Sequence, residues 1–193
     1  LGGCAPLVVG GAVMSGMVAT DRRTSGAQLD DEGIELRTAN RLRETLGDRG
    51  HVNVTSYNRQ VLLTGEVPTE QDRQLVEKTV SGVENVRSVV NELAVMGSTL
   101  LTQRSSDALI TGQVKARMVD AQDIFANAFK VVTERGAVYL MGRVTQREAD
   151  RATELTRSVN GVQRVVRVLE IITDAELQRT LPQQPAPSTA PKS

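Results

Sequence analysis

Only two side chains in this 193-residue sequence could form a thiol–imidazole pair, because Cys4 and His51 are its sole cysteine and histidine. A Ser-His-Asp or Cys-His device would have to use His51. The stretch HVNVTSYNRQVLLTGEV alternates apolar and polar residues around a turn, which predicts that His51 is a surface residue leading into a strand. One cysteine and one histidine are also too few for a transition-metal site. We therefore expect no catalytic residue and no bound metal.

Three adjacent carboxylates, Asp30, Asp31 and Glu32, form the other polar cluster that could do chemistry. They open an amphipathic run, and acidic side chains are stabilised at the N-terminus of a helix. We interpret them as capping residues of a helix rather than as a general acid–base pair. The sequence also lacks a nucleophile elbow and a Gly-rich phosphate loop. We predict that the protein is not an enzyme.

The charge balance excludes one class of partner. Lysine plus arginine and aspartate plus glutamate number 23 each, so the formal net charge is zero. A nucleic-acid-binding protein would show a basic excess or stripe. The sequence has two Phe, two Tyr and no Trp, which leaves no platform on which bases could stack. We therefore expect no nucleic-acid partner and a core of Val, Leu, Ile and Ala.

The opening stretch LGGC places Cys4 before an uncharged run, 5–19. This run is shorter than the roughly twenty apolar residues that a membrane-spanning helix needs. LGGC resembles the lipobox of bacterial lipoproteins. The resemblance implies a covalent lipid on Cys4, and Ala5 after it implies sorting to the outer membrane; we expect no other cofactor. Several acyl chains together hold a protein stably on a membrane. The alternative is that Cys4 is an ordinary buried thiol.

The sequence contains an internal repeat. Two stretches, one beginning VLLTGEV and the other VYLMGRV, both read as a strand, a polar helix, a Gly-Val pair and a valine-rich strand. Gly65 and Gly142 lie inside the first strand of each copy, where glycine indicates a bulge or the close approach of a helix backbone. Gly82 and Gly161 follow the polar helices, and we expect them to be the C-caps.

An amphipathic helix and a short strand precede each copy, so the unit is α-β-β-α-β, twice. The helices have these apolar spines: Ile34, Thr38 and Leu42 in the first, and Ile110, Val114 and Met118 in the second. We predict an α+β fold in which each unit has a three-stranded mixed sheet packed on two helices, and close packing of the two units. The expected segments are a tether (1–28), a first domain (29–96), a linker (97–104), a second domain (105–174) and a disordered Pro-rich tail (175–193).

These units resemble BON domains. The resemblance rests on V-L-L-T-G-x-V and V-Y-L-M-G-x-V, each followed by G-V-x-x-V, and on the lipobox before them. Over residues 1–173 the chain is similar to the dual BON-domain outer-membrane lipoproteins. The resemblance implies a lipid-anchored outer-membrane protein that faces the periplasm. It also implies binding of anionic phospholipid by the second domain, maintenance of outer-membrane integrity and a location at division sites.

In that family the lipid-contacting surface centres on the first helix of the second domain, which corresponds to DALITGQVKARMVD here. With Arg117 added for its charge near Lys115, the candidate phospholipid site comprises Asp107, Leu109, Ile110, Lys115, Arg117 and Val119. Leu109 falls where a family member has Trp, whose amphipathic ring anchors at membrane interfaces. From the residues alone, Lys115 and Arg117 could equally form a solvated face.

Two alternatives remain open at this point. The protein could be an interaction scaffold or a chaperone-like partner of the outer-membrane protein assembly machinery, with lipid binding incidental. Charge reversal at Lys115 would then leave function intact, whereas it would abolish vesicle binding by a lipid-binding module. On the tether, Asp21, Arg22 and Arg23 could contact headgroups, but we expect them to be solvated.

Overall fold

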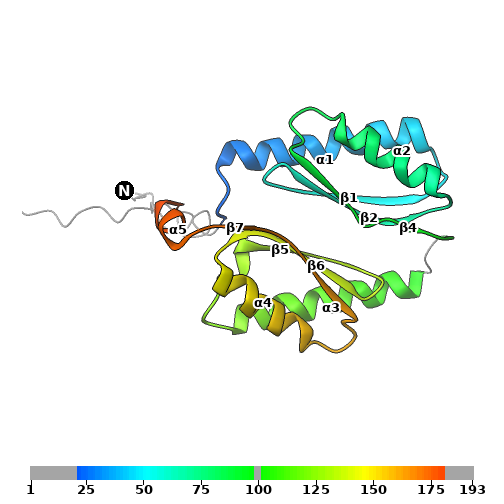
Figure 1. Cartoon of the computed structure of the whole chain (residues 1–193). Helices are drawn as coiled ribbons and strands as arrows, with labels where there is room; N and C mark the ends of the chain where they lie inside the picture. Colours follow the sequence, from blue (N-terminus) through cyan, green and yellow to red (C-terminus); the bar gives the residue numbers. More distant parts are fainter. Residues whose placement is uncertain (1–20, 98–100, 181–193) are drawn as a thin grey trace, which may run out of the picture.

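The computed structural model describes residues 21–97 and 101–180 (Figure 1). In these ranges the chain forms two units in tandem, each with a long helix, a β-hairpin, a second helix and a returning strand. The predicted α+β class and the repeated α-β-β-α-β order are therefore confirmed.

The first unit is a sheet with two helices on one face. Its elements are α1 (Ser25–Leu46), β1 (His51–Tyr57), β2 (Gln60–Val67), α2 (Glu70–Ser81), β3 (Ser88–Asn91) and β4 (Ala94–Val95). The central strand is β2, which pairs antiparallel with β1 and parallel with β3 and β4. The returning strand, expected to be continuous, is divided into β3 and β4, and Leu93 between them turns into the core formed with the helices.

The second unit has the same plan. Its elements are α3 (Leu101–Asp120), a short 3-10 turn η2 (Ala126–Ala128), β5 (Phe129–Glu134), β6 (Ala137–Val144), α4 (Gln146–Arg157) and β7 (Arg164–Ile171). Here β6 is central, antiparallel to β5 and parallel to β7 over its whole length. The helix spines predicted from periodicity are buried in both units. Each spine packs on the apolar face of its own sheet, which holds the helix against that sheet.

Both hairpins close with a two-residue turn in left-handed conformation. The turn residues are Asn58 (φ 49°) and Arg59 (φ 66°) in the first unit, and Arg135 (φ 49°) and Gly136 (φ 73°) in the second. Two consecutive positive φ values match the right-handed twist of the paired strands. The turn predicted within HVNVTSYNRQVLLTGEV is thus present, and the second unit has its counterpart.

The strand glycines Gly65 and Gly142 make room for the backbone of a neighbouring segment, which is strand β1 at Gly65 and the 3-10 turn η2 at Gly142. A β-carbon at Gly65 would lie 2.0 Å from the carbonyl oxygen of His51, and one at Gly142 would lie 2.3 Å from that of Ala128. The predicted close approach is therefore confirmed, but at Gly65 the approaching backbone is a strand and not the predicted helix. Glycine is required because no side chain fits at that separation.

The helix ends confirm one of the two predicted C-caps. Thr69 and Thr145 cap α2 and α4, the latter in a capping box with Glu148, and Gly82 is the C-cap of α2. The prediction for Gly161 is wrong, because α4 ends at Arg157 with Ser158 as its C-cap. Gly161 (φ 90°) lies in the following turn, against the side chain of Ile110.

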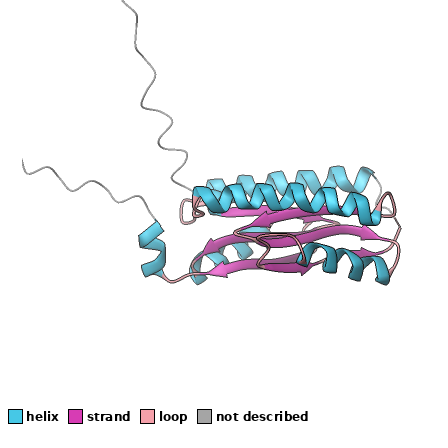
Figure 2. Cartoon of the chain, turned by 90° about the horizontal axis from the view of Figure 1, so that it is seen from above, coloured by secondary structure: helices cyan, strands magenta, loops and turns pink. Residues whose placement is uncertain are grey.

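The two sheets pack face to face, so the molecule has four layers: helices, sheet, sheet, helices (Figure 1). Between the sheets lies a third apolar core, made of Tyr57, Leu62, Ala137, Tyr139, Met141 and Val168. Ion pairs surround this core, among them Glu170 with Arg87 and Arg143. Figure 2, seen from above, shows the two long helices along one edge of the paired sheets, and Figure 1 places α1 and α3 on opposite outer faces. The predicted close packing of the units is therefore present.

The helices begin and end at residues other than the predicted segment bounds. α1 begins at Ser25, inside the expected tether, and α3 begins at Leu101, inside the expected linker. The expected tail starts with a short helix, α5 (Asp174–Thr180), rather than with disordered chain. The rest of that tail, and Cys4 with its lipobox, lie outside the described residues.

Candidate functional site

The predicted phospholipid site divides into buried and exposed residues. Asp107 and Ile110 are buried in the second unit, so the structure does not place them on a lipid-contacting surface. Ile110 packs in the apolar core beneath α3. The Asp107 carboxylate accepts hydrogen bonds from the backbone N–H groups of Arg135 (2.7 Å) and Gly136 (2.9 Å). Asp107 therefore holds the β5–β6 turn, a structural role that the sequence reasoning missed.

Asp31 occupies the same place in the first unit. Its carboxylate accepts from the backbone N–H groups of Asn58 and Arg59, both at 2.7 Å, and from the Ser56 hydroxyl at 2.7 Å. The prediction that residues 30–32 cap a helix is wrong, because α1 starts at Ser25 with Thr24 as N-cap. The same device, an aspartate on the first helix that binds the hairpin turn, is thus used in both units.

The outward face of α3 carries the other predicted residues. Leu109 and Val119 are 69% and 67% exposed. Lys115 is also exposed, whereas Arg117 points toward α4 and donates to the Ser158 hydroxyl at 3.1 Å. The outward face of α3 thus carries two large exposed apolar side chains, Leu109 and Val119, and one exposed lysine, Lys115. A charged and apolar helix face of this kind can contact a lipid surface.

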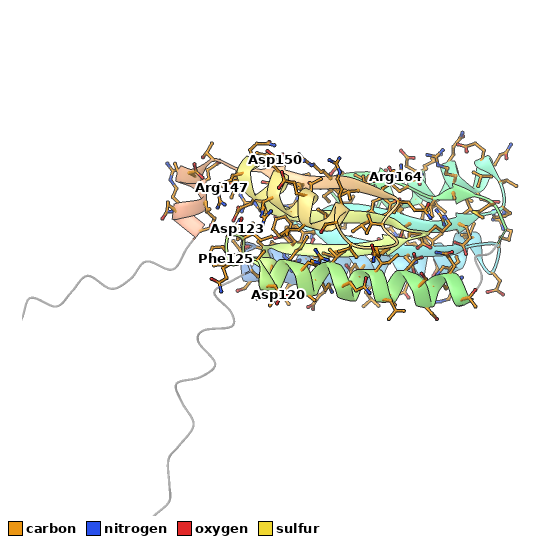
Figure 3. All side chains as sticks on the ribbon, turned by 90° about the horizontal axis from the view of Figure 1, so that it is seen from below. Asp120, Asp123, Phe125, Arg147, Asp150 and Arg164 are labelled. Atoms are coloured by element: carbon orange, nitrogen blue, oxygen red, sulfur yellow. The ribbon has the colours of Figure 1, made fainter. Side chains whose placement is uncertain are left out.

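A further apolar residue, Phe125, extends this face beyond the end of α3. It is 54% exposed and lines a small pocket with Met118, Val119, Ile124, Ala126 and Asn127. Figure 3 shows Phe125 at the end of the molecule near Asp120 and Asp123. Asp123 is held against α4 by Arg147 and Arg151, which fixes the loop that carries Phe125. Phe125 was not among the predicted site residues, although a Phe within a polar loop is an unusual feature of the sequence.

The tether residue Arg22 is buried, contrary to the expected solvation. It is 6% exposed, and its guanidinium donates to both carboxylate oxygens of Glu148, at 2.7 and 2.8 Å. It also donates to the carbonyl of Arg143 at 3.1 Å. Burial alone would raise the pKa of Glu148, but the hydrogen bonds from Arg22 and Thr145 outweigh it and hold this pKa below its ordinary value.

Arg23 is tied to the first unit. It donates to Asp31 at 2.6 Å and to Asp21, and its guanidinium lies 4.5 Å from the ring centroid of Tyr57. Burial works to lower the pKa of Arg23, yet its bonds to the two aspartates raise it well above the usual range. The sequence could not reveal the contact of Arg22 with Glu148, because the two residues are separated by 126 positions.

No helix among the described residues is both long enough and apolar enough to cross a bilayer.

Comparison with known proteins agrees with the repeat. The BON domain model matches residues 30–97 and 106–173. The outer membrane lipoprotein DolP of Haemophilus influenzae is 37% identical over 174 residues, which covers 89% of this chain and 90% of that protein. The 21 kDa hemolysin of Actinobacillus pleuropneumoniae is 34% identical over 154 residues, 79% of each chain. The chain therefore belongs to the BON-domain family, with two copies of the domain, and is similar to DolP.

Proposed function

We propose that this protein is a non-enzymatic outer-membrane lipoprotein, anchored through a covalent lipid on Cys4 and facing the periplasm. It binds anionic phospholipid through the outward face of α3 in the second BON domain. The relatives named above and the LGGC stretch support the anchor and the location. We further propose that it maintains outer-membrane integrity and acts at division sites, as the family resemblance implies.

One observation carries the lipid-binding proposal. Leu109, Val119 and Lys115 project from one helix, and within the described residues no contact covers these three exposed side chains. Apolar side chains inserted at the interface gain about 25 cal/mol for each Å² that leaves water. A lysine near anionic headgroups adds about 1 kcal/mol. Each contribution is small, but a tethered protein is already at high local concentration near the lipid.

The test is co-sedimentation of the protein with vesicles of anionic or zwitterionic phospholipid. We expect binding to anionic vesicles and its loss in the double variant Leu109→Glu with Lys115→Glu. The matched control is Leu36→Glu with Arg43→Glu, which makes the same change of charge at exposed positions of α1. The control variant should bind as the unchanged protein does.

Two outcomes would overturn the proposal. If the unchanged protein does not bind anionic vesicles, the second domain is not a lipid-binding module. Equal losses in both double variants would mean that net charge, rather than α3, controls binding. In either case the alternative predicted from sequence, a partner in outer-membrane protein assembly, would become the function to test with the same variants.

A further inference from the structure

Residues 21–23 contact both domains at once. Arg22 is clasped by the second domain, through Glu148 and the carbonyl of Arg143, and its own carbonyl lies 3.5 Å from the Arg143 guanidinium. The next residue, Arg23, binds Asp31 of the first domain. Figure 1 shows the chain descending from the start of α1 to the second unit at this point. We call residues 21–23 the clasp.

The clasp lies beside the exposed apolar end of the second domain. The Arg22 guanidinium carbon is 5.7 Å from the centroid of the Phe125 ring, within reach of a cation–π contact. Phe125 and Val119 share the lining of the pocket described above. The chain therefore joins the folded body next to two exposed apolar side chains, Val119 and Phe125.

We infer that the clasp turns the Val119–Phe125 end of the second domain toward the lipid surface that holds Cys4. The inference rests on the proposed function and adds an orientation and a contact residue to it. Without the clasp, α1 alone would fix where the tether begins, on the first domain. With it, the tether begins at the second domain, so the anchored protein presents that end first.

The geometry favours lipid over a protein partner at this end. Cys4 and Asp21 are 17 positions apart, so a bilayer that holds Cys4 lies at most about 60 Å of extended chain from the clasp. The apolar pair Val119 and Phe125 can enter the interface. Asp120 is exposed at the same end and disfavours anionic headgroups there. Lys115 therefore provides the preference for anionic lipid, and Phe125 inserts into the apolar part of the interface.

The chain has no tryptophan and one cysteine, which permits a direct measurement of orientation. The full chain is coupled through Cys4 to maleimide lipid in anionic vesicles that contain brominated phospholipid. Single tryptophans are introduced by Phe125→Trp, Leu109→Trp or Leu36→Trp, the last at an exposed site of α1. We expect bromine to quench the indole of Phe125→Trp strongly and that of Leu36→Trp hardly at all.

Removing the clasp should change orientation without removing lipid affinity. In the background Phe125→Trp, the second change Arg22→Gln should reduce quenching several-fold in coupled protein. Glu148→Gln should act in the same direction, and a circular-dichroism melt of each variant shows that it is folded at the temperature used. Vesicle binding of the uncoupled Arg22→Gln protein should be unchanged.

The outcomes separate this inference from the proposed function. If Leu109→Trp is quenched but Phe125→Trp is not, lipid binding stands and the orientation inferred here is wrong. The same conclusion follows if folded Arg22→Gln and Glu148→Gln leave the quenching of Phe125→Trp unaltered. If none of the three tryptophans is quenched, the lipid-binding function itself fails.

Discussion

At the scale of single residues, the buried carboxylates fix turns and domain contacts. Asp31 and Asp107 accept the N–H groups of the two left-handed hairpin turns, where the backbone has no strand partner. A charged acceptor makes such hydrogen bonds short and strong. The position is thus occupied by aspartate in both domains because it must reach two consecutive N–H groups from a helix.

The variant Asp107→Ala tests this assignment. It removes both acceptors and leaves two N–H groups of the turn without a charged partner, so we expect a loss of about 2–4 kcal/mol in the free energy of unfolding. Urea denaturation measures the loss. Leu109→Ala, two positions away and exposed, should stay within about 0.5 kcal/mol. Unchanged stability in Asp107→Ala, with vesicle binding lost, would return Asp107 to the lipid-contacting surface.

Periodicity predicted some of these residues and could not predict others. The spine of Ile110, Val114 and Met118 also implies that Leu109 and Lys115 point outward, so the exposed part of the site follows from helical spacing. Ile110 was predicted both as part of the helix spine and as part of the phospholipid site, and its burial agrees with the spine. The pairing of Arg22 with Glu148 depends on how two domains dock, which no local pattern encodes.

At the scale of elements, one glycine position recurs in the central strand of each sheet. At Gly142 the neighbouring chain approaches so closely that a β-carbon would meet the Ala128 carbonyl, an atom that cannot move away as a side chain can. A β-carbon added at Gly112, the glycine of α3, would meet no atom of a neighbouring segment within 4 Å. These two sites therefore respond to the same substitution in opposite directions.

Gly142→Ala should destabilise the second domain severely, since the strand or the η2–β5 segment must shift. Gly112→Ala should instead raise the free energy of unfolding by about 0.5–1 kcal/mol, because alanine favours an exposed helical site. Thermal denaturation followed by circular dichroism compares the two variants. Tolerance of Gly142→Ala would mean that the approach to Ala128 relaxes easily and that glycine is not required there.

At the scale of the whole molecule, both faces of each central strand are buried. One face of β2 packs on its own helices through Leu63, and the other packs on the second sheet through Leu62. The sequence contained a signal for this arrangement, since VLL and VYLM are continuous apolar runs rather than alternating ones. The expected close packing is present. The sheet-to-sheet face was not predicted, because a period-two pattern identifies only one apolar face of a strand.

Acid should weaken the contacts at the edge of this interface. Burial would raise the pKa values of Glu148 and Glu170, but hydrogen bonds, from Arg22 and Asn58 respectively, outweigh it and lower both below their ordinary values. Each therefore contributes stability above the unfolded-state pKa of about 4.3, and this is lost as the pH falls through the lower folded-state value. Urea denaturation between pH 7 and pH 3 should show this decline, less steeply in Glu148→Gln. An equal slope in that variant would contradict the assignment.

The apolar interface between the sheets should decide whether the two domains behave as one body. Leu62→Glu places a carboxylate without a cationic partner in the third core but leaves the helix-facing core of the first domain intact. Since an unpaired buried charge is strongly disfavoured, we expect the domains to separate rather than bury it. Small-angle scattering should show a larger radius of gyration, and calorimetry two transitions instead of one.

Leu75→Glu provides the control, because Leu75 is an exposed leucine of the same domain and receives the same new charge. That variant should keep the compact radius and the single transition. If Leu62→Glu also keeps both, the sheets are not held together by their apolar faces, and the edge ion pairs must dominate. Separation with intact domains would mean that the edge pairs, the clasp included, hold their geometry only because the apolar faces dock first.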